Sequence, residues 1–292
     1  MKAREEVREA IAWACRHLGE QGIEAPRLTA ELLLAHVLGW DRIRIVSHGE
    51  EKLPPDAARE FRALVERRSR GEPLQYLSGE REFYGLSFKV NASVLIPRPE
   101  TEILVEQALQ WAHSGGWDTG ARFVDVGTGS GCIAVALASR QPGSCGWAVD
   151  ISTAALAVAR FNAIRHGVEA RIGLVCADLL TCFAPAPAFP LILANLPYIP
   201  CSESGDLAPM VRDYEPPGAL FAGESGLEAY RRLIPQAAAR LGPGGRIILE
   251  AGAGQAPALA GMLEAEGLPV VDVVQDLQGI ARCLVAVKNL KG

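Results

Sequence analysis

The sequence predicts an α/β fold with a mostly parallel sheet of seven strands, preceded by a small helical domain and a β-hairpin linker. From residue 122 onward, short apolar segments alternate with longer helical stretches, a pattern typical of a parallel sheet covered by helices on both faces. Residues 1–78, in contrast, carry apolar residues at helical spacing. The chain of 292 residues is long enough for one large domain or two smaller ones.

Three helices are expected in residues 1–78. Proline residues precede or open two of them, at Pro26 and at Pro54 and Pro55. The apolar positions that define the three helices are Val7, Ile11, Ala14 and Leu18, then Leu28, Leu32, Leu33, Val37 and Leu38, then Ala57, Phe61, Leu64 and Val65. No catalytic motif falls in this region, so we expect the chemistry to lie in the rest of the chain.

Residues 79–98 are the predicted hairpin and linker. The segment 83–90 combines aromatic and β-branched residues around Gly85, which favours a short hairpin. After Pro97 and Pro99, a helix is expected from Thr101 to about Trp111. Residues 99–292 then form the predicted α/β domain.

Seven strands are expected in this domain. They are Arg122–Val126, Cys145–Asp150, Ala170–Cys176, Leu191–Ala194, Arg246–Glu250, Pro269–Val274 and Cys283–Val287. Helical stretches separate several of them, at Gly131–Arg140, Ala154–His166 and Leu227–Leu241.

Charge and composition limit the function classes. The net charge of −5 counts against a long nucleic-acid substrate, because proteins that bind one usually present a basic field. No run of 18 uncharged apolar residues is present, and the N-terminus lacks the apolar core of a signal peptide. The seven cysteines are scattered without a C-x-x-C pair, and the five histidines show no metal spacing. We expect a cytoplasmic monomer with no metal ion and no membrane contact.

A glycine-rich loop follows the first predicted strand. Glycines at such a loop let a ligand approach the backbone, where a Cβ would block it. A dinucleotide fingerprint would have its third glycine at Cys132, one position later than this sequence has it. The spacing D-x-G-x-G-x-G resembles the nucleoside–methionine loop of the Rossmann-like class I methyltransferases. That resemblance implies binding of S-adenosyl-L-methionine by Asp125, Gly127, Thr128, Gly129, Ser130 and Gly131.

Two more acidic residues follow the next predicted strands. Asp150 ends the second strand, 19 residues after Gly131, where a carboxylate can accept both ribose hydroxyls. Its alternative role is to cap the helix that starts near Ser152. Asp178, next to Leu179, follows the third strand and resembles the adenine-edge contact of the same families. The three features in order are more specific than any one alone.

The fourth predicted strand leads into Asn195, Leu196, Pro197 and Tyr198. This resembles the (Asn/Asp)-Pro-Pro-Tyr motif of methyltransferases that act on exocyclic amines and amides. The nitrogen of such a group is a poor nucleophile because its lone pair is delocalised. The side-chain oxygen of Asn195 and the carbonyl of residue 196 can accept its two N–H groups, which orients it toward the methyl donor that Asn195 also borders. Tyr198 can pack against the planar group. The alternative is a plain strand-exit turn.

Leu196 stands where the motif has its first proline. Because Pro197 follows, residue 196 is still biased toward extended backbone and its carbonyl stays available. The turn is less rigid, however, and it gains an N–H group. Asn-Leu-Pro-Tyr also resembles the motif of the rRNA adenine dimethylases, which widens the choice of substrate.

Segments outside these motifs resemble the release-factor glutamine methyltransferases, the PrmC/HemK family, over nearly the whole chain. The segments are 27–33, 75–79, 83–90, 96–102, 215–220 and 226–230. The resemblance implies an S-adenosyl-L-methionine-dependent enzyme that methylates N5 of the glutamine in the Gly-Gly-Gln motif of peptide-chain release factors and yields S-adenosyl-L-homocysteine. It also implies that the N-terminal domain docks the release factor, the expected partner.

Three alternatives remain open from the sequence. They are methylation of a ribosomal-protein glutamine, methylation of adenine in RNA, and cofactor binding without catalysis because of Leu196. Two further interpretations concern single residues. Arg98 and Glu100 are expected either to pin the linker against the cofactor loop or to lie in a solvated hinge. Glu250, at the end of the fifth strand, is interpreted as a structural hydrogen-bond acceptor.

Overall fold

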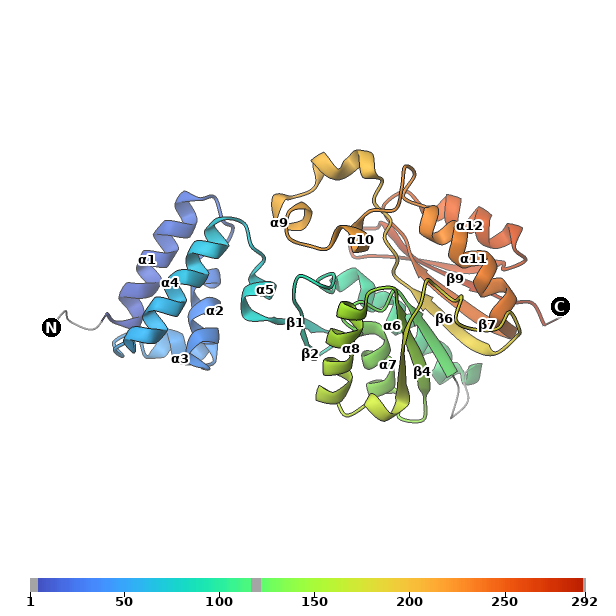
Figure 1. Cartoon of the computed structure of the whole chain (residues 1–292), viewed down its shortest axis with the longest axis horizontal. Helices are drawn as coiled ribbons and strands as arrows, with labels where there is room; N and C mark the ends of the chain where they lie inside the picture. The colour runs from blue at the N-terminus through green and yellow to red at the C-terminus, as the bar shows by residue number, and fades with distance from the viewer. Residues whose placement is uncertain (1–4, 117–121, 291–292) are drawn as a thin grey trace. The chain divides into compact units, whose positions relative to one another are not determined.

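The computed structural model describes residues 5–116 and 122–290, and the chain divides into two compact units (Figure 1). The first consists of Met1–Glu80 and Ala208–Tyr214, and the second of Arg81–Leu207 and Glu215–Gly292. The boundaries expected from the sequence assign residues 208–214 to the α/β domain. They lie in the first unit instead, where the hydroxyl of Tyr214 donates a hydrogen bond of 3.0 Å to the carbonyl of Arg70.

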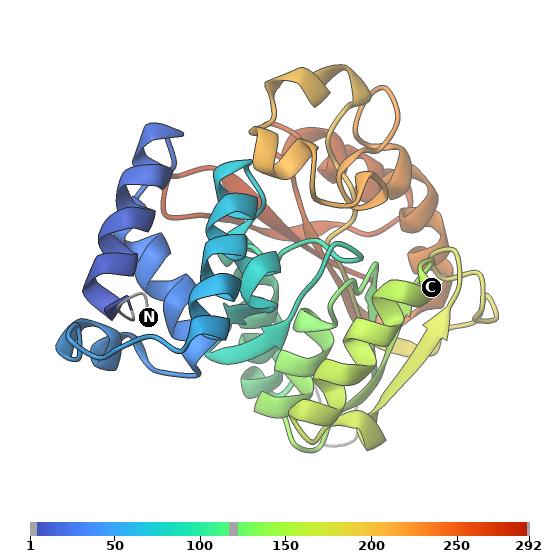
Figure 2. The same ribbon diagram turned by 60° about the vertical axis from the view of Figure 1, so that its left-hand side comes forward.

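The first unit is built of helices, of which those before residue 80 are blue and cyan in Figure 2, whereas the one within residues 208–214 is yellow-orange. They are α1 (Val7–Glu20), α2 (Pro26–Leu38), α3 (Arg42–Ser47), α4 (Pro55–Ser69), α5 (Leu74–Ser78) and α9 (Pro209–Arg212). The three helices predicted for residues 1–78 are confirmed as α1, α2 and α4. Helices α3 and α5 are too short for their apolar spacing to be recognised in the sequence.

Helix α2 does not bury all of its leucines. Leu28 and Leu32 are 39% and 36% exposed, although their spacing fits the helical pattern. The helix packs through Ala30, Leu33 and Leu34 instead, and it also buries Glu31. The carboxylate of Glu31 accepts hydrogen bonds from two arginines, Arg27 at 3.0 Å and Arg42 at 2.8 Å. Pairing with these guanidinium groups compensates the cost of burying the charge.

The predicted hairpin consists of β1 (Glu80–Phe83) and β2 (Leu86–Lys89). Tyr84 and Gly85 join them with φ angles of 52° and 73°, as expected for the type I′ turn that matches strand twist. The N–H of Tyr84 donates to Glu102 in the first turn of α6 (Glu102–Trp111), at 2.9 Å. The hairpin is thereby tied to the α/β part of its own unit.

The second unit contains the seven predicted strands in the order β5-β4-β3-β6-β7-β9-β8. Among the strands described, only β9 runs antiparallel to the others. Their bounds are β3 (Arg122–Val126), β4 (Cys145–Asp150), β5 (Ile172–Cys176), β6 (Phe189–Ala194), β7 (Leu241–Glu250), β8 (Val270–Gln275) and β9 (Ala281–Val287). The expected mostly parallel sheet is confirmed.

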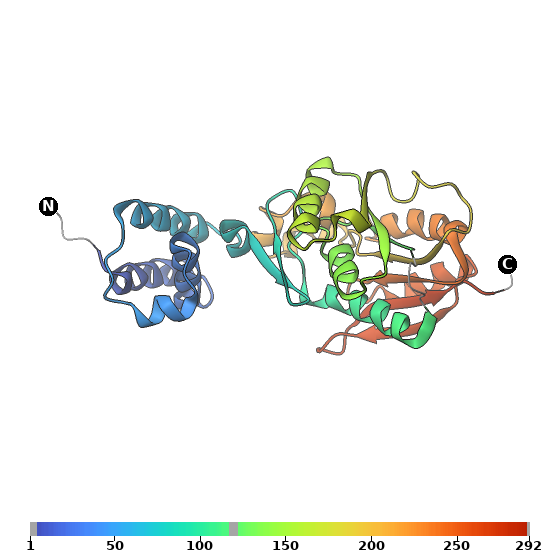
Figure 3. The same ribbon diagram turned by 90° about the horizontal axis from the view of Figure 1, so that it is seen from below.

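Helices cover both faces of this sheet (Figure 3). One core packs α6 and α7 (Cys132–Arg140) against strand residues such as Phe123, Leu191 and Leu193. The other packs α11 (Glu228–Arg240) and α12 (Ala256–Ala265) against alternate strand residues such as Val124 and Ile192. The remaining elements are η1 (Pro99–Thr101), η2 (Ala112–Gly116), α8 (Thr153–Arg165), η3 (Glu169–Arg171), η4 (Cys201–Asp206) and α10 (Pro217–Leu220). The central strands β3 and β6 are buried on both faces and are therefore mostly apolar on both sides, whereas the edge strand β8 is largely exposed.

The register of the sheet places the ends of its central strands level. Val126, at the end of β3, pairs with Val149 on β4 and with Ala194 on β6. The chain winds from β3 toward β5 on one side and continues from β6 toward β7 on the other. Ligands of open α/β sheets bind outside the carboxyl ends of the strands at such a switch point.

Two glycines provide a test of this packing. A Cβ on Gly146 of β4 would lie 2.6 Å from the ring of Phe123, whereas a Cβ on Gly261 of α12 would meet nothing within 4 Å. Gly146→Ala is therefore expected to lower the free energy of unfolding by about 1–3 kcal/mol. Gly261→Ala, the same chemical change, is expected to raise it by about 0.5–1 kcal/mol. Urea denaturation of both variants measures the difference, and equal effects would contradict the packing described.

Candidate active site

A cavity of about 350 Å³ lies at the carboxyl ends of the central strands, within the size range of small-molecule sites. Most residues predicted for the site line it. They are Gly127, Thr128, Gly129, Ser130, Asp150, Asp178, Leu179, Asn195, Leu196 and Pro197. Asp125, Gly131 and Tyr198, which the sequence analysis also assigned to the site, are not part of the lining.

Asp125 lies underneath the glycine loop. Its fully buried carboxylate accepts hydrogen bonds from the hydroxyl of Thr128 at 2.5 Å and from the N–H of Ala134 at 3.3 Å. Burial raises the pKa of this carboxyl to about 7, while the bond from Thr128 lowers it. Asp125 therefore holds the loop in shape and does not face the cavity.

Two glycines of the loop are required for close packing. Gly127 has a φ of 73°, and a Cβ there would lie 2.8 Å from a terminal methyl carbon of Leu196. Gly131 has a φ of 81°, and a Cβ there would lie 3.0 Å from the Cβ of Ala159 on α8. Gly127 thus lets Leu196 pack against the loop, and Gly131 lets α7 start close to α8.

Asp150 faces the cavity at the end of β4. Its two oxygens accept hydrogen bonds of 2.9 Å each, from the N–H of Gly129 and the N–H of Ser152. The N-cap of α8 is Ser152, whose hydroxyl accepts the N–H of Ala155, so the alternative role of Asp150 as a cap is not observed. Each carboxylate oxygen keeps a further lone pair, so Asp150 can also accept hydrogen bonds from the hydroxyl groups of a ligand in the cavity.

Asp178 and Leu179 follow β5. Leu179 has a φ of 53°, in the left-handed region that is uncommon for residues other than glycine. Asp178 forms an ion pair with Arg232 of α11, and Arg232 also lines the cavity. The sequence analysis did not identify Arg232, because its partner lies 54 residues earlier in the chain.

Asn195 has one end of its side chain tied down. Its Nδ2 donates a hydrogen bond of 3.0 Å to the hydroxyl of Thr101, which donates one of 2.6 Å to the carboxylate of Glu250. Among residues 5–116 and 122–290, no group donates to Oδ1 of Asn195. The structure thus leaves the amide oxygen of this cavity-lining residue available as an acceptor.

The additional N–H of Leu196 has a buried partner. It donates a hydrogen bond of 3.2 Å to the hydroxyl of Tyr230, which donates one of 2.6 Å to the backbone carbonyl of Glu250. Within the described part of the chain, the carbonyl of Leu196 accepts no backbone hydrogen bond. The departure from proline at this position is therefore accommodated without an unsatisfied donor.

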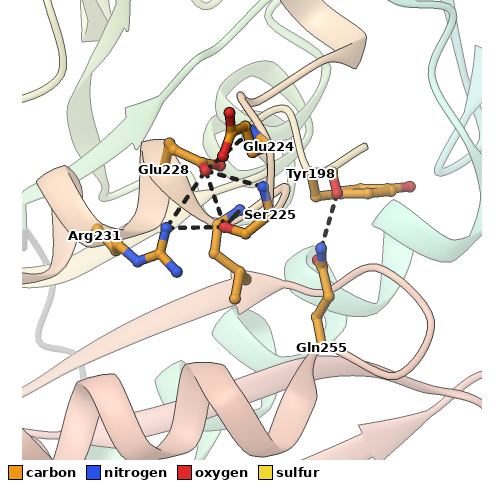
Figure 4. A network of polar contacts seen from close by, with 7 residues as sticks. Tyr198, Glu224, Ser225, Glu228, Arg231 and Gln255 are labelled. Carbon is orange, nitrogen blue, oxygen red and sulfur yellow. Dashed lines mark hydrogen bonds and ion pairs between the residues drawn. The ribbon is translucent and has the colours of Figure 1, made fainter. Parts of the chain in front are cut away.

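The backbone around Tyr198 is also held in place (Figure 4). The side-chain amide of Gln255 donates to the carbonyl of Tyr198 at 2.8 Å and accepts the N–H of Gly252 at 3.1 Å. Burial raises the pKa of Tyr198 to about 12, so its phenol stays neutral near pH 7. Nearby, Glu228 accepts the N–H groups of Glu224 and Ser225, and the hydrogen bond from the backbone of Ser225 is the main cause that lowers its pKa to about 2.

The linker is pinned to the segment after η4. Arg98 pairs with the buried carboxylate of Glu215 at 2.5 Å, and the same carboxylate accepts the N–H of Ile96 at 3.1 Å. Arg98 lines the cavity but does not bind the glycine loop. It is therefore anchored, but to a different segment from the one considered in the sequence analysis.

The sequence analysis missed Thr101, Tyr230 and Gln255 as parts of the site. Thr101 lies in segment 96–102 and Tyr230 in segment 226–230, and both segments carry the family resemblance. Their polar side chains could therefore have been predicted to belong to the site. No signal in the sequence indicated Gln255.

The described residues fit neither the role of metal ligands nor that of membrane-spanning helices. Over residues 5–116 and 122–290, no three His, Cys, Asp or Glu residues lie close enough together to hold a metal ion. No helix in the same ranges is both long and apolar enough to cross a membrane.

The parallel sheet with its glycine loop, acidic strand end and Asn-Leu-Pro-Tyr turn defines a class I methyltransferase, as predicted. A methyltransferase domain family matches residues 123–214, and the PrmC N-terminal domain family matches residues 9–79. The hMettl16 catalytic domain, solved with a 3′UTR hairpin, shares the fold with a TM-score of 0.56 and 19% identity, over 78% of this chain and 82% of that one.

Comparison with curated proteins identifies the family. A release factor glutamine methyltransferase of Geobacter sulfurreducens is 42% identical over 278 residues, which cover 94% of each chain. One of Cereibacter sphaeroides is 43% identical over 279 residues, 95% of this chain and 97% of that one. The chain belongs to the release factor glutamine methyltransferase family, which confirms the resemblance seen in the sequence.

The raised pKa of Asp125 predicts a dependence of stability on pH. The folded-state pKa of about 7 lies above the ordinary value of 3.8, so this group stabilises the fold fully below about pH 3.8. That contribution is lost as the pH rises through about 7. Between about pH 4 and 8, the free energy of unfolding of the wild type should fall by on the order of 4 kcal/mol more than that of Asp125→Asn.

Urea denaturation across the pH series measures this difference. Asp206→Asn, which changes an exposed aspartate in the same way, should keep the wild-type slope. An Asp125→Asn slope equal to that of the wild type would contradict the burial of a titrating carboxyl under the loop.

Proposed function

We propose that this chain transfers a methyl group from S-adenosyl-L-methionine to the side-chain amide nitrogen of a glutamine in peptide-chain release factors. Within a release factor, the proposed target is N5 of the glutamine in the Gly-Gly-Gln motif. The observation that carries the proposal is a pair of available acceptors, Oδ1 of Asn195 and the carbonyl of Leu196, beside a class I cofactor cavity. The names of the relatives supply the class of protein substrate.

The cavity fits the proposed cofactor. Asp150 offers acceptor positions for the ribose hydroxyls at the end of β4. Leu179 and Ile151 supply apolar wall for a flat base, and Asp178 lies beside them. Gly127, Thr128, Gly129 and Ser130 provide the loop along which the methionine part would run. When bound, S-adenosyl-L-methionine supplies an electrophilic methyl group and leaves as S-adenosyl-L-homocysteine.

The chain's own residues would act mainly by positioning. Asn195 and Leu196 accept the two N–H groups of the glutamine amide, which directs the nitrogen lone pair out of the amide plane toward the methyl donor. Tyr198 does not line the cavity, so its ring is not assigned a contact with the amide. As the carbon–nitrogen bond forms, the nitrogen becomes positively charged and acidic, so it releases a proton to solvent without a strong base.

The protein is proposed to act as a monomer, since the residues that line the cavity all belong to the second unit of the chain. A substrate that takes part in translation termination places the reaction in the cytoplasm. Residues 1–78 are proposed to dock the release factor, in keeping with the match of the PrmC N-terminal domain family to residues 9–79.

Mass spectrometry of a purified release factor incubated with the enzyme and S-adenosyl-L-methionine tests the reaction. One added methyl group on the Gly-Gly-Gln glutamine is expected. Asn195→Ala should lower kcat at least about 100-fold, because the amide loses an acceptor that orients it. Asn289→Ala, the same change at an exposed position, should leave turnover unchanged.

Two outcomes would contradict the proposed reaction. Transfer of labelled methyl to RNA and not to release factor would favour adenine methylation. Cofactor binding with no methyl transfer to protein or RNA would favour a binding module in which Leu196 has removed catalysis.

Isothermal titration tests the role of Asp150 separately. Asp150→Asn should weaken S-adenosyl-L-methionine binding by about 10- to 100-fold, because an amide NH₂ takes the place of an oxygen that can accept a hydrogen bond from a ribose hydroxyl. Asn195→Ala should change this affinity by no more than about 3-fold, and Asp206→Asn should leave it unaltered. Unchanged affinity in Asp150→Asn would remove this residue from the proposed cofactor site.

A further inference from the structure

Glu250 is a buried carboxylate that ends β7 and does not line the cavity. The parallel register pairs Leu249 with Ala194, so Glu250 lies beside the turn that starts at Asn195. Two hydrogen-bond chains connect it to the two proposed acceptors of the reacting amide. One chain ends on its side chain and the other on its backbone carbonyl.

The first chain fixes which end of the Asn195 amide faces the cavity. Thr101 has a single hydroxyl proton, which it donates to Glu250 at 2.6 Å. Its oxygen can then meet Asn195 only as an acceptor, so it takes the N–H of that side chain at 3.0 Å. The ionised carboxylate is the one member of the chain that cannot donate, and it therefore sets the direction of both bonds.

The second chain holds the backbone of Leu196. Tyr230 is fully buried, accepts the N–H of Leu196 and donates its own proton to the carbonyl of Glu250. Burial raises the pKa of Tyr230 well above its ordinary value, so the hydroxyl keeps that proton. The peptide whose carbonyl would accept the second substrate N–H begins at this residue, and its orientation depends on this contact.

We propose that Glu250 is a positioning residue for methyl transfer, which presents both acceptors through Thr101 and Tyr230 without touching the substrate itself. The inference rests on the proposed function, since it concerns the amide that Asn195 and Leu196 would hold. The hydrogen bond to Tyr230 holds the backbone of Leu196 in one conformation, as the rigid first proline would in the (Asn/Asp)-Pro-Pro-Tyr motif. Thr101 and the carboxylate of Glu250 orient the side chain of Asn195. Tyr230 and the backbone carbonyl of Glu250 hold the backbone of Leu196.

The proposal makes turnover depend on the ionisation of Glu250. Burial raises the pKa of this carboxyl to about 7, and the hydrogen bond from Thr101 lowers it. Once protonated, Glu250 can donate to Thr101, whose own proton then becomes free for Oδ1 of Asn195. The Nδ2 group would turn into the cavity and meet the N–H groups of the substrate. The other titratable and charged groups that face Glu250 are Arg98, Glu100, Cys132, Tyr198, Tyr230, Arg282 and Cys283.

Substitutions at Thr101 separate orientation from folding. Thr101→Val keeps the shape and removes the hydroxyl, and it should lower kcat by about 10- to 100-fold while S-adenosyl-L-methionine affinity stays within about 2-fold. Thr101→Ser restores the hydroxyl and should recover kcat to within about 3-fold of the wild type. Wild-type kcat in Thr101→Val, or an equal loss in both variants, would overturn the proposal.

The pH profile of kcat gives a signature that a merely structural role would not produce. The wild type should show a limb that falls with acid near the pKa of about 7 of Glu250. Glu250→Gln should lower kcat at high pH by at least about 10-fold and abolish this limb. A limb that persists unchanged in Glu250→Gln would assign it to another group and count against the proposal.

A double-mutant cycle tests the second chain. In the enzyme that keeps Leu196, Tyr230→Phe leaves the buried N–H of Leu196 without a partner, so kcat should fall by about 10-fold. Leu196→Pro has no N–H at this position, and adding Tyr230→Phe to it should cost no more than about 2-fold. Equal factors in the two backgrounds would show that Tyr230 does not act through Leu196.

Nuclear magnetic resonance of the free protein keeps this test independent of the substrate. The side-chain NH₂ signal of Asn195, assigned by its absence in Asn195→Ala, should shift with pH near 7 in the wild type and lose this response in Thr101→Val and Glu250→Gln. If the wild type methylates no release factor but the signal responds, the proposed function fails and the positioning chain stands. An unresponsive signal overturns the positioning chain whatever the substrate.

Discussion

The parallel register of β3 with β4 and β6 brings Val126 level with Val149 and Ala194, and the site depends on this alignment. The segments that leave these strands carry the glycine loop, Asp150 and Asn195. Since parallel strands all point the same way, each of these segments emerges at the same edge of the sheet. Segments that lie far apart in the chain, between Ser93 and Arg232, can therefore meet around one cavity.

Polar groups buried under this edge give the site its order. Asp125 beneath the loop and Glu250 beneath the Asn-Leu-Pro-Tyr turn both have pKa values raised to about 7 by burial. Hydrogen-bond donors stabilise a buried carboxylate, and Thr128 and Thr101 each donate to one oxygen of these two groups. Burying each carboxylate costs desolvation free energy. In return, its hydrogen bonds hold the glycine loop or the Asn-Leu-Pro-Tyr turn in one conformation.

Leu196 shows how a departure from a motif is absorbed by its surroundings. Replacing proline by leucine exchanges the ring for a branched apolar side chain and adds an N–H group. The side chain packs over Gly127, where a Cβ would come within 2.8 Å, and the N–H binds Tyr230. The loop, the turn and α11 thus form one interlocked arrangement, in which the glycine is needed because the leucine is there.

The sequence by itself determined the fold class, the bounds of β3 and β4, the glycine loop and the Asn195 turn. These features depend on local periodicity and on spacing along the chain, which a sequence displays directly. It did not reveal the short helices α3 and α5, the exposure of Leu28 and Leu32, or the place of residues 208–214. Only the tertiary structure decided that Asn195 binds Thr101, that Thr101 binds Glu250 and that Leu196 binds Tyr230. These partners are separated by 94, 149 and 34 residues, and such pairs are selected by strand register and burial, which no local pattern encodes.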